Sequence, residues 1–278
     1  MTIRMLGKEV AAAIEADLQA ALSQSNLQPG LAVVLVGDDP ASQIYVSHKQ
    51  KACQRLGFHS QMIHLAGDST QEQLLTVIQE LNQDPAIHGI LVQMPLPSQI
   101  DSEAVLEAIE PAKDVDGFHP LNGGYLLAGH PRLLPCTPAG IMKMLAHYGY
   151  DVAGKSAVVI GRSNIVGKPM ALLLLQANAS VSVLHSRTPD LAAYTRTADL
   201  IVVAVGKRNV LTGEMVKDGA VVVDVGMNRL EGKKVVGDVD YDSVAPKCAL
   251  ITPVPGGVGP MTIAMLLANT YQAATQQA

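Results

Sequence analysis

Short apolar runs alternate with longer amphipathic stretches along most of this chain. The unbroken apolar runs at residues 31–36, 89–92 and 157–160 are typical of strands that are buried in a parallel sheet. The same pattern places further strands at residues 59–65, 181–184, 200–205 and 220–225. Helices are expected between them, at residues 41–56, 69–82, 102–109 and 138–148. This alternation predicts an α/β protein whose parallel sheets carry helices on both faces.

Glycine, proline and capping residues give the expected ends of these helices. Gly57 ends one helix, and the capping-box spacing of Ser69 and Glu72 opens the next. Thr137 is the expected N-cap of a helix whose first residue is Pro138. Residues 111–129 are expected to form a long, glycine-rich loop.

The order of the elements predicts two three-layer domains. No strand follows the last helix, at about residues 261–275, which is therefore expected to pack back onto the first domain. The predicted division is residues 1–137 with 260–278, and residues 138–259. The second domain is expected to be Rossmann-like, because a glycine-containing turn there joins a buried strand to a helix.

That turn runs from Gly161 to Pro169 and places free backbone N–H groups at a helix N-terminus, which favours an anion. Its glycines depart from the G-x-G-x-x-G spacing, so an ordinary strand-to-helix turn is the alternative. The candidate cofactor contacts in the turn are Gly161, Arg162, Ser163, Ile165, Val166 and Gly167.

The next strand ends in His185, Ser186 and Arg187, with no carboxylate to accept the ribose hydroxyls of NAD. Ser186 and Arg187, with Arg162, suit the 2′-phosphate of NADP instead, unless they are solvated loop residues. Further contacts are expected where later strands end, although the glycines there also fit simple turns, as does the polar turn 237–240. These residues are Val205, Gly206, Asp224 and Gly226.

Composition narrows the class of protein. The chain has 278 residues, a net charge of −5 and no Trp, which argues against a nucleic-acid-binding protein. Its cysteines, Cys53, Cys136 and Cys248, are far apart, as in a protein of the reducing cytoplasm. The N-terminus lacks a secretory pattern, and apolar runs are shorter than the ~20 residues of a membrane span. The eight histidines show no metal-ligand spacing, so no metal is expected.

Chemistry in the first half centres on a small set of polar residues. Ser42, Tyr45 and Lys49 share one face of the helix 41–56, and Gln93 lies at the carboxyl end of a strand. Lys49 can move protons only if its pKa falls from ~10.4, and by spacing alone it fits a solvated helix lysine. Either aspartate of the Lys113–Gly117 segment can accept ligand hydrogen bonds or form an Asx turn.

Four segments of the chain carry a resemblance to a known family. They are residues 89–97, the K-D-V-D-G stretch 113–117, the turn 161–169 and the proline- and glycine-rich stretch 252–262. Together, and in this order along the whole chain, they resemble the methylenetetrahydrofolate dehydrogenase/cyclohydrolase family. Met94 stands where that family commonly has leucine, a volume-conserving difference.

The resemblance implies an enzyme of one-carbon metabolism and purine biosynthesis with two activities. NADP+ oxidises 5,10-methylenetetrahydrofolate to the methenyl compound, which water converts to 10-formyltetrahydrofolate. It implies a cytoplasmic homodimer with its active site in a cleft between the domains. Lys49 becomes the principal catalytic residue. The resemblance further assigns substrate or catalytic contacts to Ser42, Tyr45, Gln93, Asp116, Pro255, Gly256 and Gly257.

Two alternatives remain at this stage. One is a dehydrogenase with little cyclohydrolase activity, or another NADP-linked oxidoreductase of similar architecture. The other is a folate- or nucleotide-binding protein without catalysis, which would need a missing Lys49 or an occluded nucleotide site, and the sequence shows neither.

Overall fold

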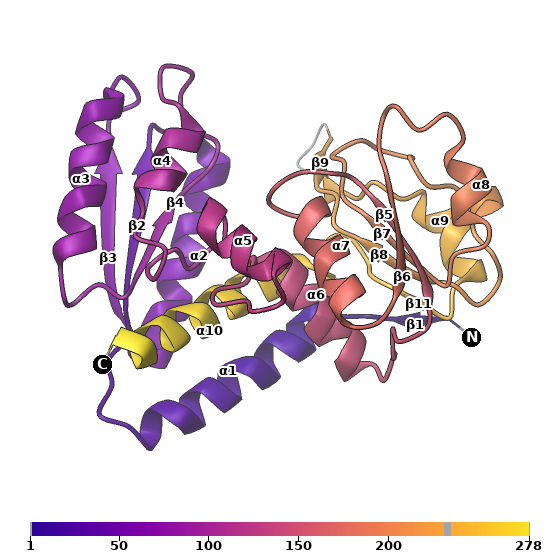
Figure 1. Cartoon of the computed structure of the whole chain (residues 1–278), viewed down its shortest axis with the longest axis horizontal. Helices are drawn as coiled ribbons and strands as arrows, with labels where there is room; N and C mark the ends of the chain where they lie inside the picture. The colour runs from indigo at the N-terminus through magenta and orange to yellow at the C-terminus, as the bar shows by residue number, and fades with distance from the viewer. Residues whose placement is uncertain (1, 231–234, 278) are drawn as a thin grey trace. The chain divides into compact units, whose positions relative to one another are not determined.

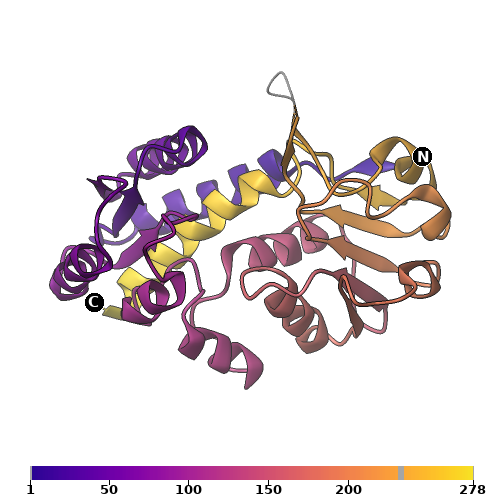
Figure 2. The same cartoon turned by 90° about the horizontal axis from the view of Figure 1, so that it is seen from above.

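The computed structural model of the chain describes residues 2–230 and 235–277 (Figure 1). The chain divides into two compact units. The first unit comprises residues 13–136 and 263–278, and the second comprises residues 1–12 and 137–262. Helices α1 (Gly7–Ser23) and α10 (Gly259–Gln277) each have residues in both units. Within the first unit the two helices run beside each other in both views (Figures 1 and 2).

The first twelve residues lie in a different unit from the one that the sequence predicts for them. Strand β1 (Ile3–Arg4) pairs in parallel with β11 (Leu250–Ile251) of the second unit. The N–H of Met5 continues this pairing and donates to the carbonyl of Ile251 at 2.8 Å. A two-residue strand has no apolar pattern of its own, so only its partner reveals it.

The first unit is built on a parallel sheet with the order β3-β2-β4. The central strand, β2 (Gly30–Val36), is buried at all seven residues, which explains its unbroken apolar sequence. Strands β3 (His59–Leu65) and β4 (Gly89–Val92) flank it. The helices that follow these three strands are α2 (Pro40–Leu56), α3 (Gln71–Gln83) and α4 (Ser102–Ala108).

The helix ends follow local hydrogen bonding. The carboxylate of Asp39 accepts a hydrogen bond from the N–H of Ser42 at the start of α2, and Gly57 ends the helix at φ 72°. The capping box of α3 is formed by Thr70 and Gln73, one residue later than predicted. The pair Ser69 and Glu72 has the same spacing, so the sequence pattern alone does not separate the two choices.

Part of the expected loop at residues 111–129 is helical. Helix α5 (Pro120–Leu127) begins after His119, whose Nδ1 accepts a hydrogen bond from the N–H of Leu121 at 3.0 Å. Two consecutive glycines, Gly123 and Gly124, weaken the helical signal in its sequence. Helix α6 (Cys136–His147) starts before Pro138, so Thr137 lies inside the helix and is not its N-cap.

The second unit contains a six-stranded sheet in which all neighbouring strands are parallel. The spatial order is β1, β11, β8 (Val221–Asp224), β7 (Leu200–Val203), β5 (Ser156–Ile160) and β6 (Ser180–Leu184). Short strands β9 (Asn228–Arg229) and β10 (Val235–Val236) form a separate antiparallel pair. Among the described residues, this unit also contains helices α7 (Gly167–Gln176), α8 (Leu191–Thr195) and α9 (Tyr241–Val244), and the 3-10 turns η1 (Gly213–Met215) and η3 (Ala245–Lys247).

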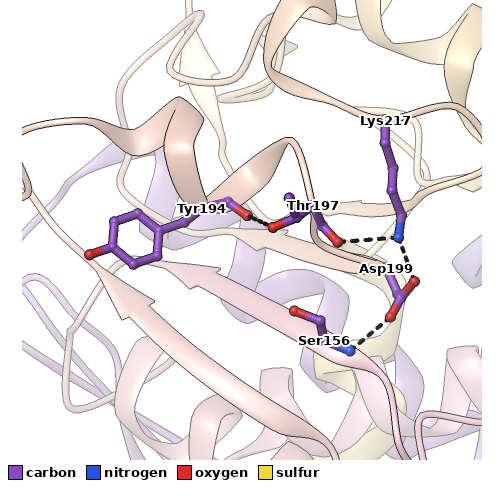
Figure 3. Close-up of polar contacts among 5 residues, drawn as sticks. All are labelled: Ser156, Tyr194, Thr197, Asp199 and Lys217. Atoms are coloured by element: carbon purple, nitrogen blue, oxygen red, sulfur yellow. Dashed lines mark hydrogen bonds and ion pairs between the residues drawn. The ribbon is translucent and has the colours of Figure 1, made fainter.

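A polar network joins the amino ends of two strands in this sheet (Figure 3). Asp199, just before β7, accepts hydrogen bonds from the N–H of Ser156 at 2.8 Å and from Lys217 Nζ at 2.6 Å. Lys217 also donates to the carbonyl of Thr197 at 3.2 Å. These contacts lie at the opposite end of the strands from the glycine turn that follows β5.

Candidate active site

Lys49 and Gln93 are brought together by two adjacent elements of the first unit. Lys49 lies on α2 and is 8% exposed, and Gln93 directly follows β4. Lys49 Nζ donates to Gln93 Oε1 at 2.9 Å, and Gln93 Nε2 donates to the carbonyl of Met94 at 2.7 Å. A carbonyl only accepts hydrogen bonds, so Met94 fixes which end of the Gln93 amide faces the amine.

Burial changes the protonation of Lys49 and of Asp116. Loss of water around the Lys49 amine lowers its pKa, and the nearby Asp116 carboxylate opposes this only in part. Burial likewise raises the pKa of Asp116 to about 6, against the attraction of Lys49. Both groups are therefore shifted toward their neutral forms, and Lys49 is closer to a working base than an exposed lysine.

The structure distinguishes Asp114 from Asp116, which the sequence does not. The Asp114 carboxylate is 1% exposed and accepts hydrogen bonds from the N–H groups of Phe118 and His119 and from Asn122 Nδ2. Asp116 as a whole residue is half-buried, but its carboxyl group is surrounded by protein, and this carboxylate accepts no hydrogen bond from the residues that the structure describes. Asp114 holds the loop, and Asp116 is the carboxylate that can accept a ligand's donors.

Two buried residues hold this loop from the other side. The Cys136 thiol donates to the carbonyl of Val115 at 3.2 Å, and Asn269 Nδ2 donates to the carbonyls of Val115 and Leu134, each at 2.8 Å. Asn269 is not among the site residues predicted from the sequence. It lies 154 positions from Val115, so no local spacing indicates the contact.

Ser42 and Tyr45 lie on α2 with Lys49, but Ser42 has a local role. Its hydroxyl donates to the Asp39 carboxylate at 2.8 Å, and the residue is 3% exposed. The Ser42 side chain therefore stabilises the start of α2. Tyr45 is half-buried one turn before Lys49.

The glycine turn of the second unit is tightly built. Gly161 has φ 132°, and a Cβ there would collide with the carbonyl of Ala204. A Cβ at Gly167 would collide with the backbone of Gly161. The Ser163 hydroxyl accepts hydrogen bonds from the N–H groups of Val166 and Gly167 at 3.2 and 3.3 Å. Only glycine allows this close approach of the turn, helix and neighbouring strand.

Exposed polar groups surround this turn and the end of β6. Arg162, Ser186 and Arg187 are exposed, and neither arginine forms an ion pair within the described ranges. His185 shapes the second loop, because its Nδ1 accepts a hydrogen bond from the N–H of Arg187 at 3.1 Å. Ile165 is 46% exposed at the tip of the turn. A strand end with available guanidinium and hydroxyl donors and no carboxylate acceptor fits a phosphorylated ribose.

The predicted cofactor residues after β7 and β8 differ in accessibility. Val205 and Gly206 are exposed. Asp224 is 3% exposed, and its carboxylate accepts hydrogen bonds from the N–H groups of Gly226, Asp238 and Val239. Burial outweighs those bonds and raises the pKa of Asp224 to about 6. The Asp224 side chain thus holds the backbone of its own unit, and a cofactor contact at this residue stays a prediction.

The proline- and glycine-rich loop belongs to the second unit. Gly256 is exposed at φ 101°, and its carbonyl accepts a hydrogen bond from the N–H of Gly7 at 3.0 Å. The N–H of Gly257 donates to the carbonyl of Pro253 at 2.8 Å, and Pro255 follows a cis peptide bond. The loop is therefore fixed from both sides.

Two kinds of feature were not found in residues 2–230 and 235–277. No helix there combines the length and apolar character of a membrane span. No group of three or more histidine, cysteine, aspartate or glutamate residues there is arranged to hold a metal ion.

Comparisons with known proteins match both units. Residues 5–116 match the tetrahydrofolate dehydrogenase/cyclohydrolase catalytic domain, and residues 135–278 match the NAD(P)-binding domain of the same family. The bifunctional protein FolD of Methylibium petroleiphilum is 61% identical over 259 residues, which cover 93% of this chain and 92% of that protein.

Solved structures agree with these matches. The bifunctional FolD of Campylobacter jejuni has a TM-score of 0.97 at 53% identity, with all of both chains covered. The FolD of Trypanosoma brucei, solved with NADP cofactor and an inhibitor, has a TM-score of 0.94 at 39% identity, covering 99% of this chain and 98% of that one.

Proposed function

The chain belongs to the tetrahydrofolate dehydrogenase/cyclohydrolase family, and on that premise we propose how its residues divide the work of two reactions. The protein is a bifunctional enzyme. It oxidises 5,10-methylenetetrahydrofolate to 5,10-methenyltetrahydrofolate with NADP+, and it hydrolyses the product to 10-formyltetrahydrofolate.

The two reactions make different demands on the protein. In the first, NADP+ accepts a hydride from the one-carbon bridge, which leaves a methenyl cation. In the second, water adds to that carbon and loses a proton, one carbon–nitrogen bond breaks, and the formyl group remains on the other nitrogen. The hydrolysis therefore needs a group that takes a proton from water and can return it to the leaving nitrogen.

Lys49 is that group in our proposal. The observation that carries it is the 2.9 Å hydrogen bond from its buried amine to Gln93 Oε1. Burial favours the neutral amine, and the bond to Gln93 orients it. Tyr45, one turn away on α2, lies where it can position the substrate or the amine.

Asp116 binds the folate in this proposal. Its carboxylate is available for the amino and ring N–H donors of the pterin, whereas the Asp114 carboxylate is occupied by the loop. Pro255, Gly256 and Gly257 supply an almost side-chain-free surface that suits contact with a flat ring.

NADP+ is held by the second unit. Arg162, Ser186 and Arg187 bind the 2′-phosphate, which explains why three exposed donors gather there without a carboxylate acceptor. The backbone of the Gly161 turn approaches the pyrophosphate. Val205 and Gly206 lie beyond the end of β7, on the path toward the nicotinamide.

The enzyme works in the cytoplasm as a homodimer in this proposal, and its product serves purine biosynthesis. The three cysteines are buried and unpaired, as suits a reducing compartment. Sedimentation of the purified chain tests the dimer directly. A monomer at micromolar concentration would refute it.

One time course tests the assignment of both activities. The purified chain receives 5,10-methylenetetrahydrofolate with either NADP+ or NAD+, and the methenyl intermediate and formyl product are followed together. We expect rapid formation of the methenyl compound with NADP+, followed by the formyl product above the uncatalysed rate. Accumulation of the methenyl compound without enzymatic hydrolysis would favour the alternative of a dehydrogenase alone.

A further inference from the structure

The second unit contains another buried carboxylate, that of Asp238, which is not among the residues assigned to either reaction. Asp238 lies in the polar turn 237–240, is fully buried, and is reached by no solvent. Its Oδ2 accepts hydrogen bonds from the N–H groups of Val205 and Gly206, both at 2.8 Å. Its Oδ1 accepts one from Asn228 Nδ2, also at 2.8 Å.

These bonds reach the loop that follows β7. Val205 and Gly206 are exposed, yet both of their N–H groups point inward to one carboxylate oxygen. Gly206 has φ 68°, a conformation that glycine adopts without strain. The carboxylate therefore fixes the path of the loop and holds the apolar side chain of Val205 at the surface, where it is 40% exposed.

Asp238 is itself fixed by Asp224 at the end of β8. The N–H of Asp238 donates to Asp224 Oδ1 at 2.9 Å. A Cβ at Gly226 would collide with the Asp238 carboxylate, and one at Gly237 would collide with that of Asp224. These two glycines thus make room for carboxylates of the protein, whereas the position of Gly226 at a strand end suggested the approach of the cofactor.

The strand order indicates which half of NADP lies over the loop that Asp238 holds. In the order β8-β7-β5-β6, the glycine turn follows β5 and the donors for the 2′-phosphate follow β6. A dinucleotide crosses such a sheet where the strand order reverses, so its other half extends over the ends of β7 and β8. The Val205–Gly206 loop lies there, next to the turn, since a Cβ at Gly161 would meet the carbonyl of Ala204.

We infer that Asp238 is a positioning residue for the nicotinamide half of NADP, acting through the backbone of Val205 and Gly206. It does not touch the cofactor. It holds the loop against which the nicotinamide and its ribose pack, and so it sets where the hydride acceptor lies. This inference rests on NADP binding by the second unit.

The test uses the Asp238→Asn variant of the full chain and two probes. Asparagine has the same size as aspartate but no charge, and its amide nitrogen cannot accept a hydrogen bond. The donors on one of the two carboxylate oxygens therefore lose their acceptor, and the loop is held less firmly. The probes are NADP+ and 2′,5′-ADP, which carries only the adenosine half and the 2′-phosphate. Dissociation constants are measured by calorimetry, and both activities are assayed alongside.

We expect the dissociation constant of NADP+ to rise by about tenfold or more and the dehydrogenase kcat to fall, while 2′,5′-ADP binds within about twofold of wild type. Cyclohydrolase activity on supplied 5,10-methenyltetrahydrofolate should be retained, because Lys49, Gln93 and Asp116 lie in the first unit. Asp240→Asn is the matched control, since the Asp240 carboxylate contacts Ser243 in the same segment.

Two results would overturn the inference. Unchanged NADP+ affinity would show that the loop does not need the carboxylate. An equal loss for 2′,5′-ADP would show that Asp238 supports the whole unit and not the nicotinamide half. If wild type itself bound neither probe, the NADP site and not the role of Asp238 would be at fault.

A milder variant covers the case in which Asp238→Asn does not fold. Asn228→Ala leaves both carboxylates in place but removes the donor to Asp238 Oδ1 and a bond to the carbonyl of Gly237. We expect the same selective loss of NADP+ affinity, smaller in size. A folded Asn228→Ala protein with wild-type affinity for both probes would contradict the inference.

Discussion

The side-chain amide of Gln93 presents its oxygen to Lys49, because its nitrogen is held by the carbonyl of Met94. The amine therefore donates one hydrogen in a fixed direction. In its neutral form it keeps a lone pair for a proton from elsewhere. In our proposal the pair is a buried base with an orienting partner, and the first predictions concern this pair and Asp116.

Replacement of Lys49 by Met removes the proposed base and keeps an unbranched apolar chain. We expect the cyclohydrolase rate to fall by at least about a hundredfold, the usual contribution of a positioned acid–base group. The dissociation constant of NADP+ should not change, because the cofactor residues lie in the other unit. Lys51→Met, at an exposed position of the same helix, is the control and should behave as wild type. Full-rate hydrolysis by Lys49→Met would remove Lys49 from the mechanism.

Replacement of Gln93 by Glu changes the charge beside the amine. A carboxylate favours protonated Lys49 and so raises its pKa, and hydrolysis then needs a higher pH. We expect the rising limb of the cyclohydrolase pH profile to move up by about one unit or more. Gln79→Glu adds the same charge at an exposed position of α3 and should leave the profile unmoved. A Gln93→Glu profile identical to wild type would show that this amide does not tune Lys49.

Asp116 is expected to make substrate affinity depend on pH. Its pKa of about 6 means that the carboxylate becomes protonated below that pH and then loses acceptor capacity. We expect the KM for 5,10-methenyltetrahydrofolate to rise as the pH falls through about 6 in wild type. In Asp116→Asn, the KM should be high and independent of pH in this range. A wild-type KM that is flat across this range would contradict the assignment.

The thermal stability of aspartate variants provides a control for the assignment of Asp116. An acid with a raised pKa in the folded chain disfavours folding once the pH exceeds its unfolded value, so Asp116→Asn should not lower the Tm at neutral pH. Asp114→Asn should lower it, because that carboxylate accepts three hydrogen bonds within the loop. The reverse pattern would exchange the roles of the two aspartates.

Much of the fold could be predicted because its information is local. Buried strands such as β2 and β5 are unbroken apolar runs, and Gly57 ends α2 by its left-handed conformation. Strand β1 has only two residues, and Gly123 with Gly124 obscures α5. These elements depend on partners and caps that a local pattern does not contain.

The candidate site likewise combines residues that the sequence indicates with contacts that it does not indicate. Lys49 and Gln93 could be proposed from the family resemblance, whereas their hydrogen bond joins residues 44 positions apart. The separate roles of Asp114 and Asp116 follow from which carboxylate the loop occupies. The Asp224 carboxylate accepts hydrogen bonds from three backbone N–H groups, one of them 15 positions away, and no local pattern indicates this set of donors.

Arg187 is expected to discriminate between the two nicotinamide cofactors. Arg187→Ser removes a guanidinium from the proposed 2′-phosphate site, so the KM for NADP+ should rise by about tenfold while the KM for NAD+ stays the same. Arg196→Ser is the control, since Arg196 Nε donates to the carbonyl of Glu214 and has no place in the site. Steady-state kinetics with both cofactors measures the effect. An equal change in KM for NADP+ and NAD+ would mean that Arg187 does not bind the 2′-phosphate.

The network around Asp199 should support stability without affecting either activity (Figure 3). The hydrogen bond from Lys217, followed by that from the Ser156 N–H, lowers the pKa of Asp199. An acid with a lowered pKa stabilises the fold above its unfolded value of about 4, and this contribution is lost as the pH falls through the folded value. Asp199→Asn should therefore lower the free energy of unfolding by roughly 1 kcal/mol at neutral pH, a small effect because the pair is partly exposed. Urea unfolding at neutral and acidic pH should show the difference from wild type shrinking in acid, and a difference that grew in acid would contradict this account.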